Sequence, residues 1–119
     1  MEGVHSLDVI YAFYREDTAN EYCRATMLRF LDLVSDLLRS KPLYYSTSHT
    51  RFGISRFGTW AESSQHPSIL VWADERWIYF TYDERWEDGP FLRSRQDAIK
   101  CTVEHGRAAL LELMARLKA

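Results

Sequence analysis

Apolar side chains recur at helical spacing in two long stretches of the chain. Between residues 19 and 40 they fall three or four positions apart, and the run ends before Pro42, whose ring disfavours a helical conformation in the preceding residue. The segment Thr18–Glu21 has the form of a capping box, in which two side chains bond free amides of the first helical turn. The spacing predicts an N-terminal helix at about 19–40 and a C-terminal helix at about 103–117.

Residues 7–14 fit two descriptions. Their apolar and aromatic side chains form a helical stripe, whereas residues 9–14 are rich in types that favour strands. Both interpretations stay open from the pattern alone, and we favour a short helix.

Between the two long helices the pattern changes to short runs of β-branched, aromatic and hydroxyl residues, which is typical of strands. These runs are residues 43–47, 51–57, 68–73 and 76–82. The last two flank Asp74-Glu75 and so predict a β-hairpin. Residues 97–101 are a candidate fifth strand. We therefore expect an antiparallel meander of four to five strands over about 43–82, with 97–101 as the optional addition.

The arms of the hairpin predict a sheet with unlike faces. An even turn centred on Asp74-Glu75 pairs Trp72 with Trp77, and directly paired residues share one side of a sheet. The aliphatic face then holds Ile69, Val71, Ala73, Ile78 and Phe80. The aromatic face holds Leu70, Trp72, Trp77 and Tyr79 between Ser68 and Thr81. Because two ordinary helices cover only one face of such a sheet, we expect the aromatic face to be partly open.

Length and composition agree with a single α+β domain over residues 1–119, with the C-terminal helix packed on one face of the sheet. The chain is 46% hydrophobic and 27% charged, as ordinary globular domains are. It has neither an apolar run of about 18 residues nor the pattern of a signal peptide, so we expect a cytoplasmic protein without a membrane partner. Cys23 and Cys101 are then expected as thiols rather than as a disulfide.

Charge is distributed in blocks around a formal net charge of −2. Residues 39–58 carry four basic side chains and no acidic one, whereas residues 74–88 carry six acids and two bases. A nucleic-acid binder typically concentrates its basic residues in one stripe, which this chain lacks. Direct binding of DNA or RNA is therefore disfavoured.

The usual motifs of catalysis are absent from the sequence. No histidine or cysteine pair has the short spacing of a metal site, and no glycine-rich loop matches a phosphate-binding pattern, so we expect no metal and no cofactor. His49, which lies among hydroxyl residues, and the two cysteines are the candidates for nucleophilic chemistry. Such hydroxyl and histidine clusters are more typical of turns.

The aromatic face and the acids that follow it form the candidate binding site. Tryptophan and tyrosine are enriched at the centres of protein interfaces, and an acidic rim speeds the capture of basic partners. The predicted partner-binding residues are Trp72, Trp77, Tyr79, Asp83, Glu84, Trp86, Glu87 and Asp88.

This site favours a non-enzymatic protein-binding module. The most concrete form is a small bacterial inhibitor or immunity protein that neutralises a toxin or effector, with a basic nuclease as the expected target. One alternative is a dimeric chaperone of a secreted effector, with a homodimer formed through an exposed edge strand such as 43–47. The other is a small enzyme that uses His49 or a cysteine.

Overall fold

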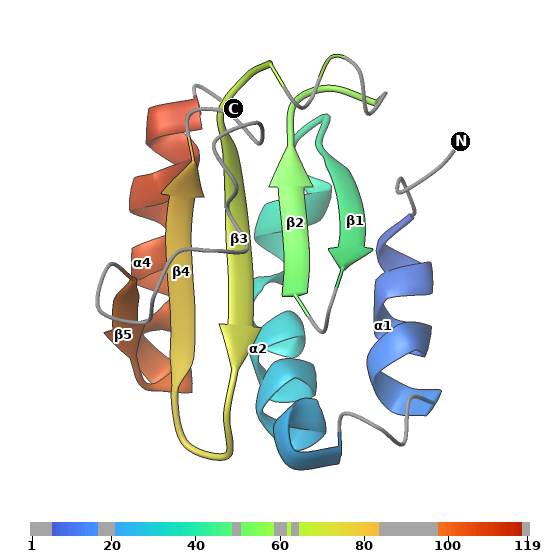
Figure 1. Cartoon of the computed structure of the whole chain (residues 1–119), viewed down its shortest axis with the longest axis vertical. Helices are drawn as coiled ribbons and strands as arrows, with labels where there is room; N and C mark the ends of the chain where they lie inside the picture. The colour runs from blue at the N-terminus through green and yellow to red at the C-terminus, as the bar shows by residue number, and fades with distance from the viewer. Residues whose placement is uncertain are drawn as a thin grey trace.

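The computed structural model describes residues 6–16, 21–48, 51–58, 62, 65–83 and 98–117. Its elements are the helices α1 (Leu7–Glu16), α2 (Glu21–Arg39) and α4 (Val103–Leu117) and the strands β1 (Tyr44–Ser48), β2 (Arg51–Ser55), β3 (Ser68–Ala73), β4 (Ile78–Asp83) and β5 (Ile99–Cys101). The strands lie in the order β1-β2-β3-β4-β5, with each neighbouring pair antiparallel (Figure 1). The predicted α+β meander between helices is confirmed, including its fifth strand.

Most predicted boundaries hold within a few residues. The ambiguous segment 7–14 belongs to helix α1, where Leu7, Ile10, Tyr11 and Tyr14 are buried on one face. Helix α2 begins at Glu21, and the other members of the predicted capping box, residues 18–20, lie outside the described residues. Strand β4 begins two residues later than predicted.

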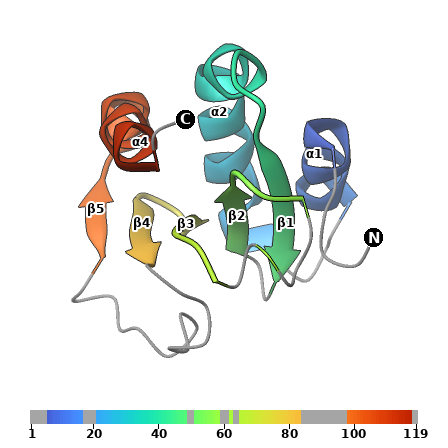
Figure 2. The same cartoon turned by 90° about the horizontal axis from the view of Figure 1, so that it is seen from above.

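All three helices lie on one side of the sheet, as the view from above shows (Figure 2). Helix α2 occupies the middle and packs against α1, α4, β3 and β4. The main core fills the space between this helical layer and the inner face of the sheet. From the hairpin it takes Ile69, Val71, Ala73, Ile78 and Phe80, which are the residues of the predicted aliphatic face.

Helix α4 packs closely against a side chain of α2 at Gly106. A Cβ atom at this position would stand 3.0 Å from two ring atoms of Phe30. Phe30 is itself fully buried, and its ring meets Phe80 of β4 edge to face at a centroid distance of 5.6 Å. Phe30 therefore fits between a helix with no side chain at the contact and an aromatic ring of the sheet.

Ion pairs join the helices on their solvent side. The guanidinium of Arg107 in α4 donates from Nη1 to Asp36 Oδ1 at 2.7 Å and from Nη2 to Asp36 Oδ2 at 3.0 Å, and Nη1 also donates to the Leu33 carbonyl at 2.8 Å. Arg29 of α2 pairs with Glu104 of α4 at 2.8 Å. The hydrogen bonds from Arg107 hold the pKa of the Asp36 carboxyl below its ordinary value of 3.8.

Both cysteines are free thiols, with Cys23 buried and Cys101 half-buried. Within the described residues, no helix combines the length and the apolarity that crossing a membrane requires.

We expect Gly106→Ala to lower the free energy of unfolding by about 1 kcal/mol. Alanine gains about 1 kcal/mol of helix propensity over glycine, but overpacking a core typically costs about 1–3 kcal/mol. Phe30 and Phe80 are both fully buried and in contact with each other near this Cβ, so we expect Phe30 to yield little. Urea unfolding of both proteins measures the difference, and Ala108→Gly on the exposed side of α4 gives the propensity change alone.

Gly106→Ala in a Phe30→Leu background tests whether the contact with Phe30 causes the loss of stability. The shorter side chain removes the clash, so Gly106→Ala should there be neutral or stabilising. An equal loss of stability in both backgrounds would contradict the proposed contact.

We expect Asp36→Asn to destabilise the protein at neutral pH and to lose this effect in acid. Because the folded state lowers the pKa of Asp36, the carboxylate stabilises the fold above its unfolded pKa and this stabilisation disappears as the pH falls through the folded value. The urea midpoints of wild type and variant should therefore converge below about pH 3.8. Glu112→Gln, an equal charge change on α4 at a residue with no ion pair to any described residue, should leave the pH profile unchanged.

Candidate functional site

The β3–β4 hairpin has a different register from the predicted one but the same faces. Trp72 lies opposite Tyr79 and Ala73 lies opposite Ile78, so the connection is Asp74–Trp77 rather than Asp74-Glu75 alone. The pairing of Trp72 with Trp77 was wrong by two residues. A shift of two leaves every side chain on its predicted side, because side chains alternate with a period of two.

Asp74 is the reason for the longer connection. Its Oδ1 accepts the backbone amides of Arg76 and Trp77, each at 2.8 Å, and its Oδ2 accepts the Tyr79 hydroxyl at 2.6 Å. The Asp74 amide in turn donates to the Trp77 carbonyl at 3.1 Å. An aspartate that accepts amides two and three residues ahead is a standard turn device, and here it also fixes the first aromatic side chain of β4.

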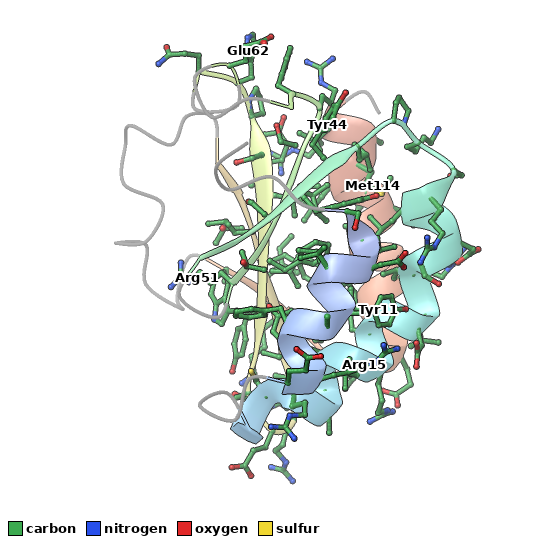
Figure 3. All side chains as sticks on the ribbon, turned by 90° about the vertical axis from the view of Figure 1, so that its right-hand side faces the viewer. Tyr11, Arg15, Tyr44, Arg51, Glu62 and Met114 are labelled. Carbon is green, nitrogen blue, oxygen red and sulfur yellow. The ribbon has the colours of Figure 1, made fainter. Side chains whose placement is uncertain are left out.

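A row of aromatic and basic side chains crosses the outer face of the sheet, the face opposite the helices. Trp72 pairs with Tyr79, and Tyr79 pairs with Lys100 of β5. Arg51 lies one residue before the Phe52–Val71 pair and therefore across from Trp72. We call Arg51, Trp72, Tyr79 and Lys100, together with the adjacent Trp77, the cation–aromatic row. Figure 3 shows Arg51 on the side of the sheet away from the helices.

The members of the row stack on one another. The rings of Trp72 and Tyr79 are nearly parallel, at 11° and a centroid distance of 5.6 Å. The Arg51 guanidinium lies 4.4 Å from the centroid of Trp72, and the Lys100 ammonium lies 4.5 Å from that of Trp77. Each cation thus covers an aromatic ring, an arrangement typically worth about 0.5–1 kcal/mol at exposed sites.

The aromatic face is less open than the sequence predicted. Trp72 is 6% exposed and Tyr79 4% exposed, and together with Leu70 they form a second buried cluster, separate from the main core. Trp77 packs against this cluster and is only half-buried. Of the predicted aromatic site residues that the structure describes, Trp77 is therefore the most exposed, and it packs against Trp72 and Tyr79.

Asp83, the described residue of the predicted acidic rim, does not lie next to this cluster. Asp83 ends β4 opposite Ser68, four residues beyond Tyr79, which places its backbone about 13 Å away along the strand. Glu84, Trp86, Glu87 and Asp88 lie outside the described residues. Asp83 and Trp77 thus mark opposite ends of the strand.

Sequence analysis missed the two cations of the row. Arg51 and Lys100 lie far apart in the chain and on different strands, so no motif joins them. Their signal is the meander itself, because consecutive antiparallel strands bring one residue from each into a single cross-strand line. An arginine or lysine at the position aligned with Trp72 and Tyr79 could have been identified once the register was known.

A further aromatic stack lies at the opposite end of β2. The rings of Phe57 and His66 stack at a centroid distance of 4.1 Å, and the Arg56 guanidinium lies 5.3 Å from the centroid of Phe57. Arg51 and Arg56 therefore cover rings at the two ends of one strand rather than converging on a common ligand.

The described thiols and imidazoles have structural surroundings. Burial raises the pKa of the Cys101 thiol, which favours the unreactive protonated form. His105 Nδ1 lies 2.8 Å from the Thr102 hydroxyl at the start of α4. No three metal-binding side chains converge among the residues that the structure describes, and His49 lies outside them.

Comparison of the chain with protein-family models, with curated proteins and with solved structures finds no match. The functional proposal therefore rests on the cation–aromatic row.

We expect Asp74→Ala to lower the free energy of unfolding by about 2–3 kcal/mol, because three donors lose a charged acceptor and hydrogen bonds to charged groups are typically worth about 1.5–3 kcal/mol. Tyr79→Phe removes one of the three bonds and should cost about 1 kcal/mol. Chemical denaturation measures both changes. A loss below about 0.5 kcal/mol for Asp74→Ala would show that the turn does not depend on this carboxylate.

Proposed function

We propose that this protein is a non-enzymatic protein-binding module that docks its partner at the Trp77 end of the outer sheet face. The observation that carries the proposal is the placement of Trp77. Its ring is half-buried, rests against the buried cluster of Leu70, Trp72 and Tyr79, and has the Lys100 ammonium 4.5 Å from its centroid.

Such a ring has the properties of an interface hot spot. A tryptophan offers a large contact area, and hot spots are enriched in tryptophan at well-packed positions. Trp77 is also held in place before binding, because its backbone amide donates to Asp74 and its ring packs against the buried cluster of Leu70, Trp72 and Tyr79. A preorganised side chain loses little conformational entropy on binding, so more of its contact energy appears as affinity.

Within this class we propose an inhibitor or immunity protein that neutralises a toxin or effector by direct binding. A preorganised aromatic anchor suits a protein whose task is to cover another protein's surface. The sequence predicted a basic target from the acids at 83–88. The proposal for Trp77 does not depend on those acids, since Asp83 lies at the other end of β4.

Site-specific photo-crosslinking tests the proposal in the organism that makes the protein. A photoreactive tryptophan analogue, which keeps the indole ring, replaces Trp77 in one variant and Leu111 in a matched control; Leu111 is 47% exposed on α4, which lies on the opposite face of the sheet. We expect a defined protein partner to be captured from position 77 and not from position 111. Products of genes beside this one are the first candidates to be tested with purified components.

With the captured partner in hand, Trp77→Ala should weaken binding by more than about 2 kcal/mol, whereas Leu111→Ala should leave it unchanged. Circular dichroism of Trp77→Ala must match wild type. Unchanged affinity in a folded Trp77→Ala variant would refute the proposed site. Crosslinks from position 77 to a second copy of the chain would favour the dimeric chaperone instead.

A further inference from the structure

We propose that the Trp77 surface recognises an acidic segment of the partner protein and that a partner carboxylate is bound by the Lys100 ammonium and the Trp77 indole N–H. This inference rests on the proposed function and adds the chemistry of the partner. It reverses the expectation of a basic target, because the charged side chain that lies on the accessible ring of Trp77, that of Lys100, is cationic.

Lys100 is the first observation. It is exposed on β5, its ammonium lies over Trp77, and it has no ion-pair partner in the part of the chain that the structure describes. An ammonium group carries three hydrogen-bond donors and no acceptor. Contact with the ring face leaves those donors available, so Lys100 offers a positioned positive charge beside the proposed anchor.

The indole N–H of Trp77 is the second observation. Indole nitrogen is a donor only, and a buried tryptophan usually finds an acceptor for it. Here Trp77 makes a backbone hydrogen bond to Asp74, but its ring nitrogen has no acceptor among the described residues. The Lys100 ammonium and the Trp77 indole N–H are both hydrogen-bond donors, and the first is charged. Together they suit a carboxylate and not a cation.

Arg51 extends the positive charge along the row. It lies over Trp72, and three strand-to-strand steps separate it from Lys100, or about 14 Å at the usual strand spacing. Cations at this separation do not share one small anion. A partner carboxylate at Lys100 is therefore bound by Lys100 and Trp77 without Arg51.

A protein segment fits this surface better than a nucleic acid. Single-stranded nucleic acids bind through several accessible rings on which successive bases stack. In this row Trp72 and Tyr79 are buried, which leaves Trp77 as the accessible ring of the three. The exposed Glu75, two residues before Trp77 in the same turn, would also repel a phosphate backbone, whereas a peptide can place an acid at Lys100 and a neutral or basic residue at Glu75.

Nuclear magnetic resonance titration of the full chain tests the chemistry without a known partner. The probes are hexaglutamate, hexalysine and a short oligothymidylate, added separately to isotope-labelled protein. We expect hexaglutamate to shift the Trp77 indole and Lys100 amide resonances, and these shifts to disappear at about 0.5 M salt, where charges are screened within a few ångströms. Hexalysine should leave both resonances unchanged. Stronger shifts of these two resonances by hexalysine or by oligothymidylate than by hexaglutamate would overturn the proposal.

Charge reversal then tests it on the captured partner. Lys100→Glu should weaken binding at least about tenfold and Lys100→Arg should restore most of the affinity, as expected for a contact that depends on charge. Lys41→Glu, the same change at an exposed residue after α2, should alter affinity less than about twofold.

The two proposals fail in different ways. If Trp77→Ala abolishes binding but Lys100→Glu does not weaken it, the binding site stands and the acidic partner is refuted. If position 77 captures no partner, the proposed function itself is refuted.

Discussion

The ring of Phe30 lies between Gly106 of α4 and the ring of Phe80 in β4, and this contact sets the spacing at which the two longest described helices meet the sheet. Helix α2, which carries Phe30, also contacts α1 and β3, so this contact belongs to the helix that joins the helical layer together. Interiors are packed as tightly as organic crystals, which leaves little freedom to shift one of these elements alone. With the described helices α1, α2 and α4 on one face, the described side chains of the other face pack across the strands.

The two faces of the hairpin belong to different clusters of buried side chains. Side chains of the inner face, such as Val71 and Phe80, belong to the main core, whereas Trp72 and Tyr79 of the same strands form a cluster of their own. The cation–aromatic row therefore draws its rigidity from the sheet without being part of the core that stabilises it. A surface arranged in this way can change its accessible residues, Trp77 and Lys100, at small cost to the fold.

Much of this architecture could be predicted from spacing alone, because helices of period 3.6 and strands of period 2 leave distinct patterns. The hairpin register could not, since the side-chain bonds of Asp74 lengthen the connection beyond the two residues that looked like its turn. The burial of Trp72 was also beyond prediction, because alternation tells which face a side chain occupies but not what packs over that face. Arg51 and Lys100 join the row only through strand order, which no local motif encodes.

The alternation of side chains along the hairpin limits which insertions and deletions this protein can accept during evolution. Because the faces survive a shift of two residues, insertions or deletions of two residues between β3 and β4 would preserve which side chains enter the core. A single residue inserted into the strand directly before Ile78 would instead move Ile78 and Phe80 outward and bring Tyr79 into the core. Length variation at this hairpin should therefore occur in steps of two, and the aromatic row can move along the sheet without leaving its face.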